Sequence, residues 1–328
     1  MPMKIFVAGG AGYIGSHTVK ELIQEGFEVA IFDNLSTGKR ELIVDGELIV
    51  GDLMDKNSLK KAFSSGDIKA VLHFASLIQV GESYVDPQKY YSHNLLSSLN
   101  LLEAMIEAEV KYFIFSSSAA VYGIPEKIPI PESHPLNPIN PYGQTKLFIE
   151  KILQDYEKAY GLKFISLRYF NAAGADPDGR LGEMHQPETH LIPCLLLFLL
   201  GQKKNFDLFG TDFPTPDKTA VRDYIHVTDL ARAHVLALHH LLATSKSEFI
   251  NIGTNRGYSV LEIIKKTEEI TGEKILFRKK PRRKGDVPLL LASKDKAERI
   301  LGWKPQYSDV ETIIKTAWEW HRKTVKRK

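Results

Sequence analysis

Short runs of apolar, mostly β-branched residues alternate with longer amphipathic stretches through the first half of the chain. The apolar runs predict strands at 5–8, 29–32, 48–50, 70–74, 112–116 and 164–167. The amphipathic stretches that separate most of these strands predict helices at 14–24, 58–64, 95–107 and 146–159. Because strands that alternate with helices are typical of a parallel sheet with both faces covered, we expect an α/β, Rossmann-like, doubly wound fold.

The regular alternation ends after Tyr169, where a loop rich in glycine, aspartate and proline extends from 171 to 187. We therefore expect a nucleotide-binding domain at 1–170 and a second, smaller, mixed α/β domain at 171–328. Within the second range, 221–253 is expected to return to the first domain, with a strand and a helix at 224–242. The apolar run 191–200 is too short for the ~20 residues that span a bilayer, so it predicts a buried helix.

Composition limits the classes of partner and compartment. The chain has 328 residues, of which 43% are hydrophobic and 25% charged, enough for a full core. Its net charge of +3 does not require a nucleic-acid partner, and the basic stretch 321–328 predicts a solvated helix end. The single cysteine, Cys194, and an N-terminus without a secretion signal predict a cytoplasmic protein that binds no membrane.

Three glycines, Gly9, Gly12 and Gly15, follow the first predicted strand and begin the first predicted helix. A tight turn of this kind lets the backbone approach a pyrophosphate and directs helix N–H groups at its charge. Asp33 ends the next strand about twenty residues later, where a carboxylate binds ribose hydroxyls. No arginine follows Asp33 to bind a 2′-phosphate, so the pattern predicts NAD rather than NADP.

Two further strand ends lie on the same predicted edge. Asp52 follows the strand at 48–50, where its carboxylate could bind the adenine amino group; the alternative is that Asp52 caps the helix after Asp55. Phe74 and Ala75 close the strand at 70–74, where the dinucleotide is expected to pass.

The strongest local signal for chemistry is Tyr142 followed by Lys146. Residues four apart share one face of a helix, so the ammonium of Lys146 can stabilise a phenolate at Tyr142. A phenol of pKa ~10 requires such help to act as a base near neutral pH. The spacing also occurs by chance on helices, but Ser118 follows the preceding strand and places a hydroxyl near the same point. We therefore predict Tyr142, Lys146 and Ser118 as catalytic residues.

Together these motifs resemble the UDP-glucose 4-epimerases of the extended short-chain dehydrogenase/reductase superfamily, over nearly the whole chain. The matching segments are 9–17, 33–35, 80–83, 116–123, 168–171 and 221–227. Similar sugar-nucleotide dehydratases carry an acidic pair where this chain has Ala119 and Ala120, which disfavours dehydration. The resemblance implies that Tyr142, assisted by Ser118, removes the proton of the sugar C4 hydroxyl while a hydride passes to bound NAD and later returns to the opposite face.

The resemblance also extends the predicted sites. On the cofactor side, which includes Tyr142 and Lys146, it adds Tyr13, Ile14, Asn34, Leu53, Asn94 and Phe170. For a UDP-sugar it implies that Asn171 meets the diphosphate, that Phe209 packs on uracil, and that Arg222 and Arg283 grip the phosphates. The rest of this substrate set is Ser118, Tyr142, His190, Asp286 and Leu290. The alternative for 279–284 is a solvated basic loop.

Three positions depart from the family pattern or bear on the substrate. Ile78 replaces a lysine that some members place near the cofactor, and His190 replaces an asparagine that binds the nucleotide. Leu290 occupies the position where tyrosine accompanies strict hexose enzymes and smaller residues accompany N-acetyl sugars. An epimerase for N-acetylated or pentose UDP-sugars therefore stays open.

A different class, an inactive NAD-sensing protein, needs none of the three catalytic residues, so their joint presence argues against it. We expect no metal site. The resemblance implies a homodimer that pairs the helices at 95–107 and 146–159.

Overall fold

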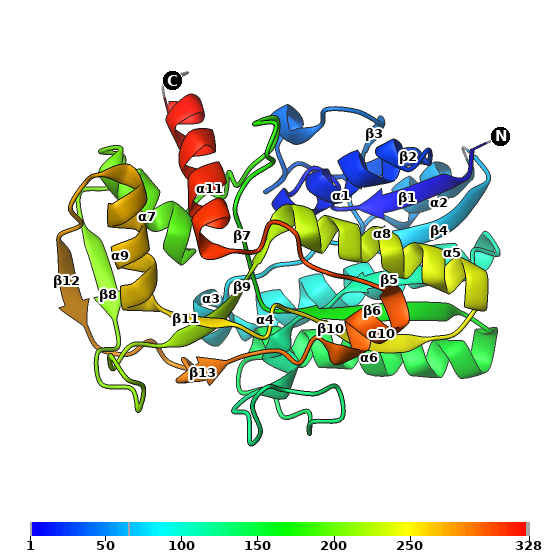
Figure 1. Cartoon of the computed structure of the whole chain (residues 1–328). Coiled ribbons are helices and arrows are strands. Elements are labelled where there is room, and N and C mark those ends of the chain that lie inside the picture. Colours follow the sequence, from blue (N-terminus) through cyan, green and yellow to red (C-terminus); the bar gives the residue numbers. More distant parts are fainter. Residues whose placement is uncertain (1, 65, 326–328) are drawn as a thin grey trace.

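The computed structural model describes residues 2–64 and 66–325 and is built around a seven-stranded, wholly parallel sheet (Figure 1). The strand order is β10-β6-β5-β4-β1-β2-β3, so the chain winds outward in both directions from the β1–β4 pair. The predicted Rossmann-like fold is confirmed, and each of the six predicted strands is present. The strands are β1 (Lys4–Ala8), β2 (Glu28–Asp33), β3 (Glu47–Val50), β4 (Ile68–His73), β5 (Tyr112–Ser116), β6 (Lys163–Tyr169) and β10 (Glu248–Ile252).

Helices cover both faces of this sheet. α1 (Tyr13–Gln24) and α8 (Val227–Thr244) pack on one face, and α2 (Lys56–Ser64), α5 (Leu96–Glu107) and α6 (Pro141–Tyr160) pack on the other. Successive side chains of β1 point to opposite faces, so Ile5 and Val7 join one core cluster while Phe6 and Ala8 join the other. All four predicted helices are present, and the last begins five residues earlier than expected, at Pro141.

Shorter elements connect the strands. Their bounds are η1 (Arg40–Leu42), α3 (Val80–Val85), α4 (Pro87–Tyr90), the π-helical turn η2 (Tyr91–Leu95) and η3 (Ala119–Tyr122). η3 directly follows β5, and η2 leads into α5, so both lie next to residues that the sequence assigns to the cofactor or the chemistry.

The second region has two small sheets. In the first, β9 (Val221–His226) pairs with β7 (Asn171–Ala173), β11 (Gly257–Ser259) and β13 (Leu289–Leu290). In the second, β8 (Phe206–Phe209) pairs with β12 (Phe277–Lys280). α7 (Leu191–Leu199), α9 (Val260–Thr271) and α11 (Val310–Val325) gather at this end of the molecule (Figure 1). α7 confirms the predicted buried helix. Across residues 2–64 and 66–325, no helix is both long and apolar enough to cross a membrane.

The two regions are interleaved more than the sequence predicts. Within 221–253, α8 and β10 do return to the main sheet, whereas the strand expected near Tyr224 is β9, which belongs to the second region. α10 (Asp295–Leu301) then packs on α8, and Trp303 is buried in the core of the first region. Of the basic stretch 321–328, residues 326–328 lie outside the described residues.

A buried ion pair fastens α6 to β6. Arg168 donates from Nη2 to Glu150 Oε2 (2.7 Å) and from Nε to Glu150 Oε1 (2.9 Å), and both side chains are at most 3% exposed. The hydroxyls of Ser117 and Ser166 also donate to Glu150 Oε1. This network fixes the helix that carries Tyr142 and Lys146 against the sheet.

Replacing Glu150 by alanine is expected to lower the free energy of unfolding by about 3–5 kcal/mol, because the Arg168 charge would stay buried without its partner. Urea denaturation of the purified chain measures this change. The matched control is Asp155→Ala on the same helix, whose pair with Lys158 is 3.6 Å long and more than three-quarters exposed, so less than about 1 kcal/mol is expected. Equal denaturation midpoints for the two variants would contradict the importance of the network.

Candidate active site

The glycine turn lies between β1 and α1 at the centre of the main sheet. Gly9 has φ +81°, and a Cβ there would lie 2.5 Å from the Ala75 nitrogen. A Cβ on Gly15 would lie 2.2 Å from the Gly9 carbonyl oxygen, so the first turn of α1 packs directly on the strand end. Gly12 is the N-cap and no side chain caps α1. The first N–H groups of α1 are therefore left for an anion such as a pyrophosphate.

Asp33 stands at the end of β2 beside this turn. Its Oδ2 accepts from the Ala11 N–H (3.0 Å) and its Oδ1 accepts from the Leu35 N–H (2.8 Å). Burial raises the pKa of Asp33, and these two N–H donors partly offset the rise. A glycine-rich turn next to a fixed carboxylate fits the pyrophosphate and ribose of NAD.

Asn34 and Asp52 lie together at the ends of β2 and β3. Asn34 Nδ2 donates to Asp52 Oδ2 (2.9 Å), and the Met54 N–H donates to Asp52 Oδ1 (2.8 Å). The residue before α2 that accepts from its first turn is Asp55, through the Asn57 N–H (3.0 Å). The alternative role of Asp52 as a helix cap is therefore wrong, and the pair is placed at the predicted cofactor edge.

The end of β4 closes the other side of the turn. The Ala75 N–H donates to the Ala8 carbonyl, and the Phe74 ring packs on a buried histidine of α8. Asn94, in η2, accepts from the Leu77 N–H (2.8 Å) and donates to Thr145 Oγ1 (3.1 Å). Asn94 therefore joins the segment after β4 to the helix turn between Tyr142 and Lys146.

Local signals at the start of α6 place Tyr142 in its first turn. The Asn140 side chain accepts from the Gly143 N–H (2.7 Å), and Pro141 occupies the first helical position. This cap starts the helix next to η3, which follows Ser118.

Tyr142, Lys146 and Ser118 meet in a nearly dry site. Tyr142 is 7% exposed and Lys146 is 2% exposed. Lys146 Nζ donates to the Ser116 carbonyl (3.0 Å) and lies 5.8 Å from the centre of the Tyr142 ring. Burial raises the pKa of Tyr142, and Ser118 lowers it in part; burial lowers the pKa of Lys146 to about 7. An ammonium at Lys146 would favour a phenolate at Tyr142, because nearby opposite charges stabilise each other.

An apolar wall borders this triad. Phe170 and Ala119 are buried in one cluster, and Leu290 of β13 packs against it. β13 pairs with β9 so that Leu290 stands opposite Arg222. Leu290 therefore lies between the residue that follows Ser118 and the predicted phosphate ligands.

Four predicted UDP ligands gather in the second region. The Arg283 guanidinium lies 5.4 Å from the centre of the Phe209 ring, and its Nε donates to Asp286 Oδ2 (3.2 Å). Burial lowers the pKa of Arg222. The negative charge of Asp286 raises that pKa in part, and the positive charge of Arg283 lowers it further. Asn171 lies on β7, beside Tyr224 of β9.

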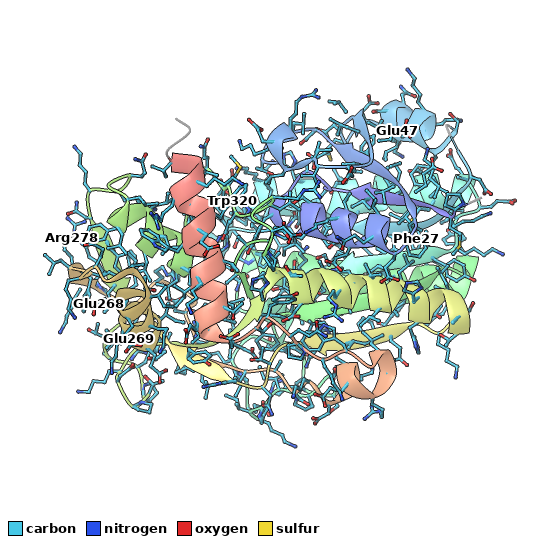
Figure 2. All side chains as sticks on the ribbon, turned by 45° about the horizontal axis from the view of Figure 1, so that its top comes forward. Phe27, Glu47, Glu268, Glu269, Arg278 and Trp320 are labelled. Carbon is cyan, nitrogen blue, oxygen red and sulfur yellow. The ribbon has the colours of Figure 1, made fainter. Side chains whose placement is uncertain are left out.

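Two basic side chains near Arg283 in the sequence form ion pairs at the surface. Arg278 pairs with Asp207 and Arg282 pairs with Asp212, both in exposed ion pairs. Figure 2 shows Arg278 at the outer end of the molecule. Within 279–284, the alternative of a solvated basic loop therefore fits Arg282, whereas Arg283 faces Phe209.

His190 is engaged by its own loop. It is the N-cap residue of α7, and its Nδ1 lies 2.7 Å from Glu183 Oε1 and 3.1 Å from Glu188 Oε1. Burial alone would lower the pKa of His190, but the two carboxylates raise it well above its usual range. Sequence reasoning did not predict Glu183 or Glu188 as neighbours of this residue.

Tyr13 and Tyr84 make contacts between the two regions. The sequence did not predict these contacts. Tyr13, predicted only at the cofactor, donates from its hydroxyl to the Gly174 carbonyl (2.7 Å). Tyr84, which directly follows the motif at 80–83, donates to the Ile139 carbonyl (2.6 Å) and its ring lies 4.9 Å from Lys284 Nζ. The position of Tyr84 after that motif is the signal that could have identified it.

Comparisons with known proteins agree with this geometry. The model of the "NAD dependent epimerase/dehydratase family" matches residues 5–253. The chain is 49% identical to a UDP-glucose 4-epimerase of Lactobacillus helveticus, over 98% of this chain and 97% of that one. It is similar to the crystal structure of UDP-glucose 4-epimerase from Brucella ovis in complex with NAD (46% identity, 96% and 97% covered, TM-score 0.94). It is also similar to the enzyme from Bifidobacterium longum in complex with NAD⁺ and UDP (39%, 98% and 99%, TM-score 0.94).

Gly15→Ala is expected to weaken NAD binding about 5- to 150-fold, because overpacking a close contact costs ~1–3 kcal/mol. The NAD released per chain on denaturation, together with titration of the stripped protein, measures the loss. Gly81→Ala is the control, since no heavy atom lies within 4 Å of the added Cβ. Full NAD content in Gly15→Ala would show that the turn does not hold the cofactor.

Proposed function

Because the chain belongs to the NAD dependent epimerase/dehydratase family, we propose that it interconverts UDP-glucose and UDP-galactose by inverting the hydroxyl at sugar C4. The observation that carries the proposal is the buried triad of Ser118, Tyr142 and Lys146 at the end of β5, which β4 separates from the strand that leads into the glycine turn. An NAD sensor has no need of a buried base with a partner lysine, so this geometry favours catalysis.

The triad supplies the proton chemistry. Tyr142 removes the proton of the C4 hydroxyl, and the Ser118 hydroxyl holds the phenol and the sugar oxygen in line. Lys146, held by the Ser116 carbonyl, stabilises the phenolate from the next turn of α6. NAD, when bound, accepts the hydride from C4 and gives it back. Tyr142 then returns its proton to the oxygen, which completes a cycle with no net oxidation.

The second region holds the nucleotide while the sugar moves. We assign Arg222 and Arg283 to the diphosphate, Phe209 to the uracil ring, and Asn171 to the diphosphate from β7. Asp286 orients Arg283 through their hydrogen bond. Because these contacts involve only the nucleotide, the 4-keto sugar is free to turn and present its other face.

The direct test is to incubate the purified chain with UDP-galactose, without added NAD, and to separate the products. We expect a mixture that contains UDP-glucose, since each cycle regenerates the cofactor. A folded, NAD-loaded chain that converts none of the substrate would favour the inactive NAD sensor.

Tyr142→Phe is expected to reduce turnover by about 100-fold or more, because it removes the base while keeping the packed ring. NAD content should stay close to that of the unmodified chain. Tyr160→Phe, at the exposed end of the same helix, is the matched control and should retain full turnover. Near-normal turnover in Tyr142→Phe would place the base elsewhere.

Leu290 is expected to admit N-acetylated sugars at reduced efficiency. The leucine lies against the wall formed by Ala119 and Phe170 and offers an acetamide no hydrogen bond. Burial of an amide without a partner costs ~1–3 kcal/mol, which is about a 5- to 150-fold handicap. Measured kcat/KM for UDP-N-acetylgalactosamine should fall further in Leu290→Tyr, with UDP-galactose little affected. No change in the N-acetyl rate would mean that Leu290 does not select the substrate.

We further propose a cytoplasmic homodimer. Leu96 on α5 and Phe148 on α6 are 46% and 38% exposed, and the free thiol of Cys194 suits a reducing compartment. A dimer through α5 and α6 would cover both apolar side chains. Light scattering should give twice the 37.0 kDa of one chain, and a mass of one chain would contradict the dimer.

A further inference from the structure

Four side chains of the segment before α7 converge on one point: Glu183, His185, Glu188 and His190. One ligand atom of each lies within 4.8 Å of the others. His185 Nδ1 and His190 Nδ1 approach the same oxygen, Glu183 Oε1, at 2.8 and 2.7 Å. Glu188 lies 3.1 Å from His190 Nδ1 and 3.9 Å from His185 Nδ1. The reaction proposed above uses neither carboxylate nor His185.

These separations suit a tetrahedral metal ion. Bonds of ~2.0–2.2 Å from Zn²⁺ to imidazole nitrogen and carboxylate oxygen place neighbouring ligand atoms ~3.3 Å apart. The printed nitrogen–oxygen separations run from 2.7 to 3.9 Å, the 3.1 and 3.9 Å values being to different oxygens of Glu188, and one ligand atom from each residue lies within 4.8 Å of the others. An ion at the centre would replace the hydrogen bonds that now join the two histidines to the two carboxylates.

The chemistry of the ligands narrows the class of ion. Two imidazoles and two carboxylates form a mixed nitrogen–oxygen set, which first-row divalent metals prefer, whereas Ca²⁺ and Mg²⁺ prefer oxygen alone. The two carboxylate charges balance one dication. Both carboxylates are almost fully buried, with side chains 5% and 4% exposed, so positive charge beside them, from a protonated imidazole or from a cation, offsets their burial.

Hydrogen bonds from neighbouring residues hold the segment that carries the cluster. The Glu188 carboxylate accepts from the backbone N–H of Thr189 (2.7 Å). The Trp320 indole donates to the Glu183 carbonyl (3.1 Å), and Lys203 donates to the Glu188 carbonyl (2.8 Å). Trp320 comes from α11, far away in the sequence (Figure 2). Contacts of this kind orient metal ligands before the metal binds.

We propose that Glu183, His185, Glu188 and His190 form a structural site for one first-row divalent cation, with Zn²⁺ as the best fit. The Tyr13 ring lies edge-on to His185, with ring centres 6.2 Å apart, and Tyr13 begins α1 directly behind the glycine turn. The ion would fix the loop before α7 between α1 and α11 and would set the orientation of His190. The proposal departs from the expectation of a chain without metal.

The test uses the untagged chain, stripped with a chelator and titrated with Zn²⁺ against a chromophoric competitor. We expect one Zn²⁺ per chain and a higher thermal midpoint on binding. His185→Gln should bind Zn²⁺ about 100-fold more weakly or worse, since even the loss of an outer partner costs ~10- to 100-fold. His239→Gln, which changes an exposed histidine of α8 outside the cluster, should bind Zn²⁺ like the unmodified chain.

Glu188→Gln provides a second variant should His185→Gln fold poorly, and circular dichroism reports the folding of both. Absence of one-to-one Zn²⁺ binding in the unmodified chain would overturn the proposal. So would equal Zn²⁺ affinity in the folded ligand variants and the control. Because neither NAD nor a UDP-sugar enters this titration, its outcome is independent of the proposed epimerase activity.

Discussion

Exclusion of water from Tyr142 and Lys146 is the constraint on which the site depends. A phenol and an amine that are 7% and 2% exposed both resist their charged forms, which is why burial raises one pKa and lowers the other to about 7. Lys146 Nζ lies 5.8 Å from the centre of the Tyr142 ring, so in the proposed reaction the ammonium would favour the phenolate.

The rest of the fold keeps this pair in place. The Asn140 cap starts α6 at the correct residue, and the Glu150–Arg168 pair fixes the same helix to β6. Tyr13 and Tyr84 then tie the nucleotide-binding region to the second region through backbone carbonyls and a basic loop. α8, β10 and α10 come from the second half of the chain and pack with the main sheet, so the two regions share part of one core cluster.

What the sequence reveals depends on whether the signal is local. Six of the seven strands of the main sheet, the glycine turn and the Tyr142–Lys146 spacing follow short-range patterns, and the structure contains each of them, whereas β10 was not predicted as a strand. The sheet to which β9 belongs could not be predicted, because its partners β7, β11 and β13 are short and lie up to about seventy residues away. For the same reason, nothing local indicated that Trp320 would support Glu183.

The central claim is that one hydride leaves C4 and returns to C4 without mixing with solvent. UDP-galactose labelled with deuterium at C4, converted by the purified chain in ordinary water, tests this directly by mass spectrometry or NMR of the UDP-glucose formed. Retention of the deuterium at C4 of the product is the predicted result. Loss of the label to water, or uptake of solvent deuterium at C4 in the reverse experiment, would contradict the account.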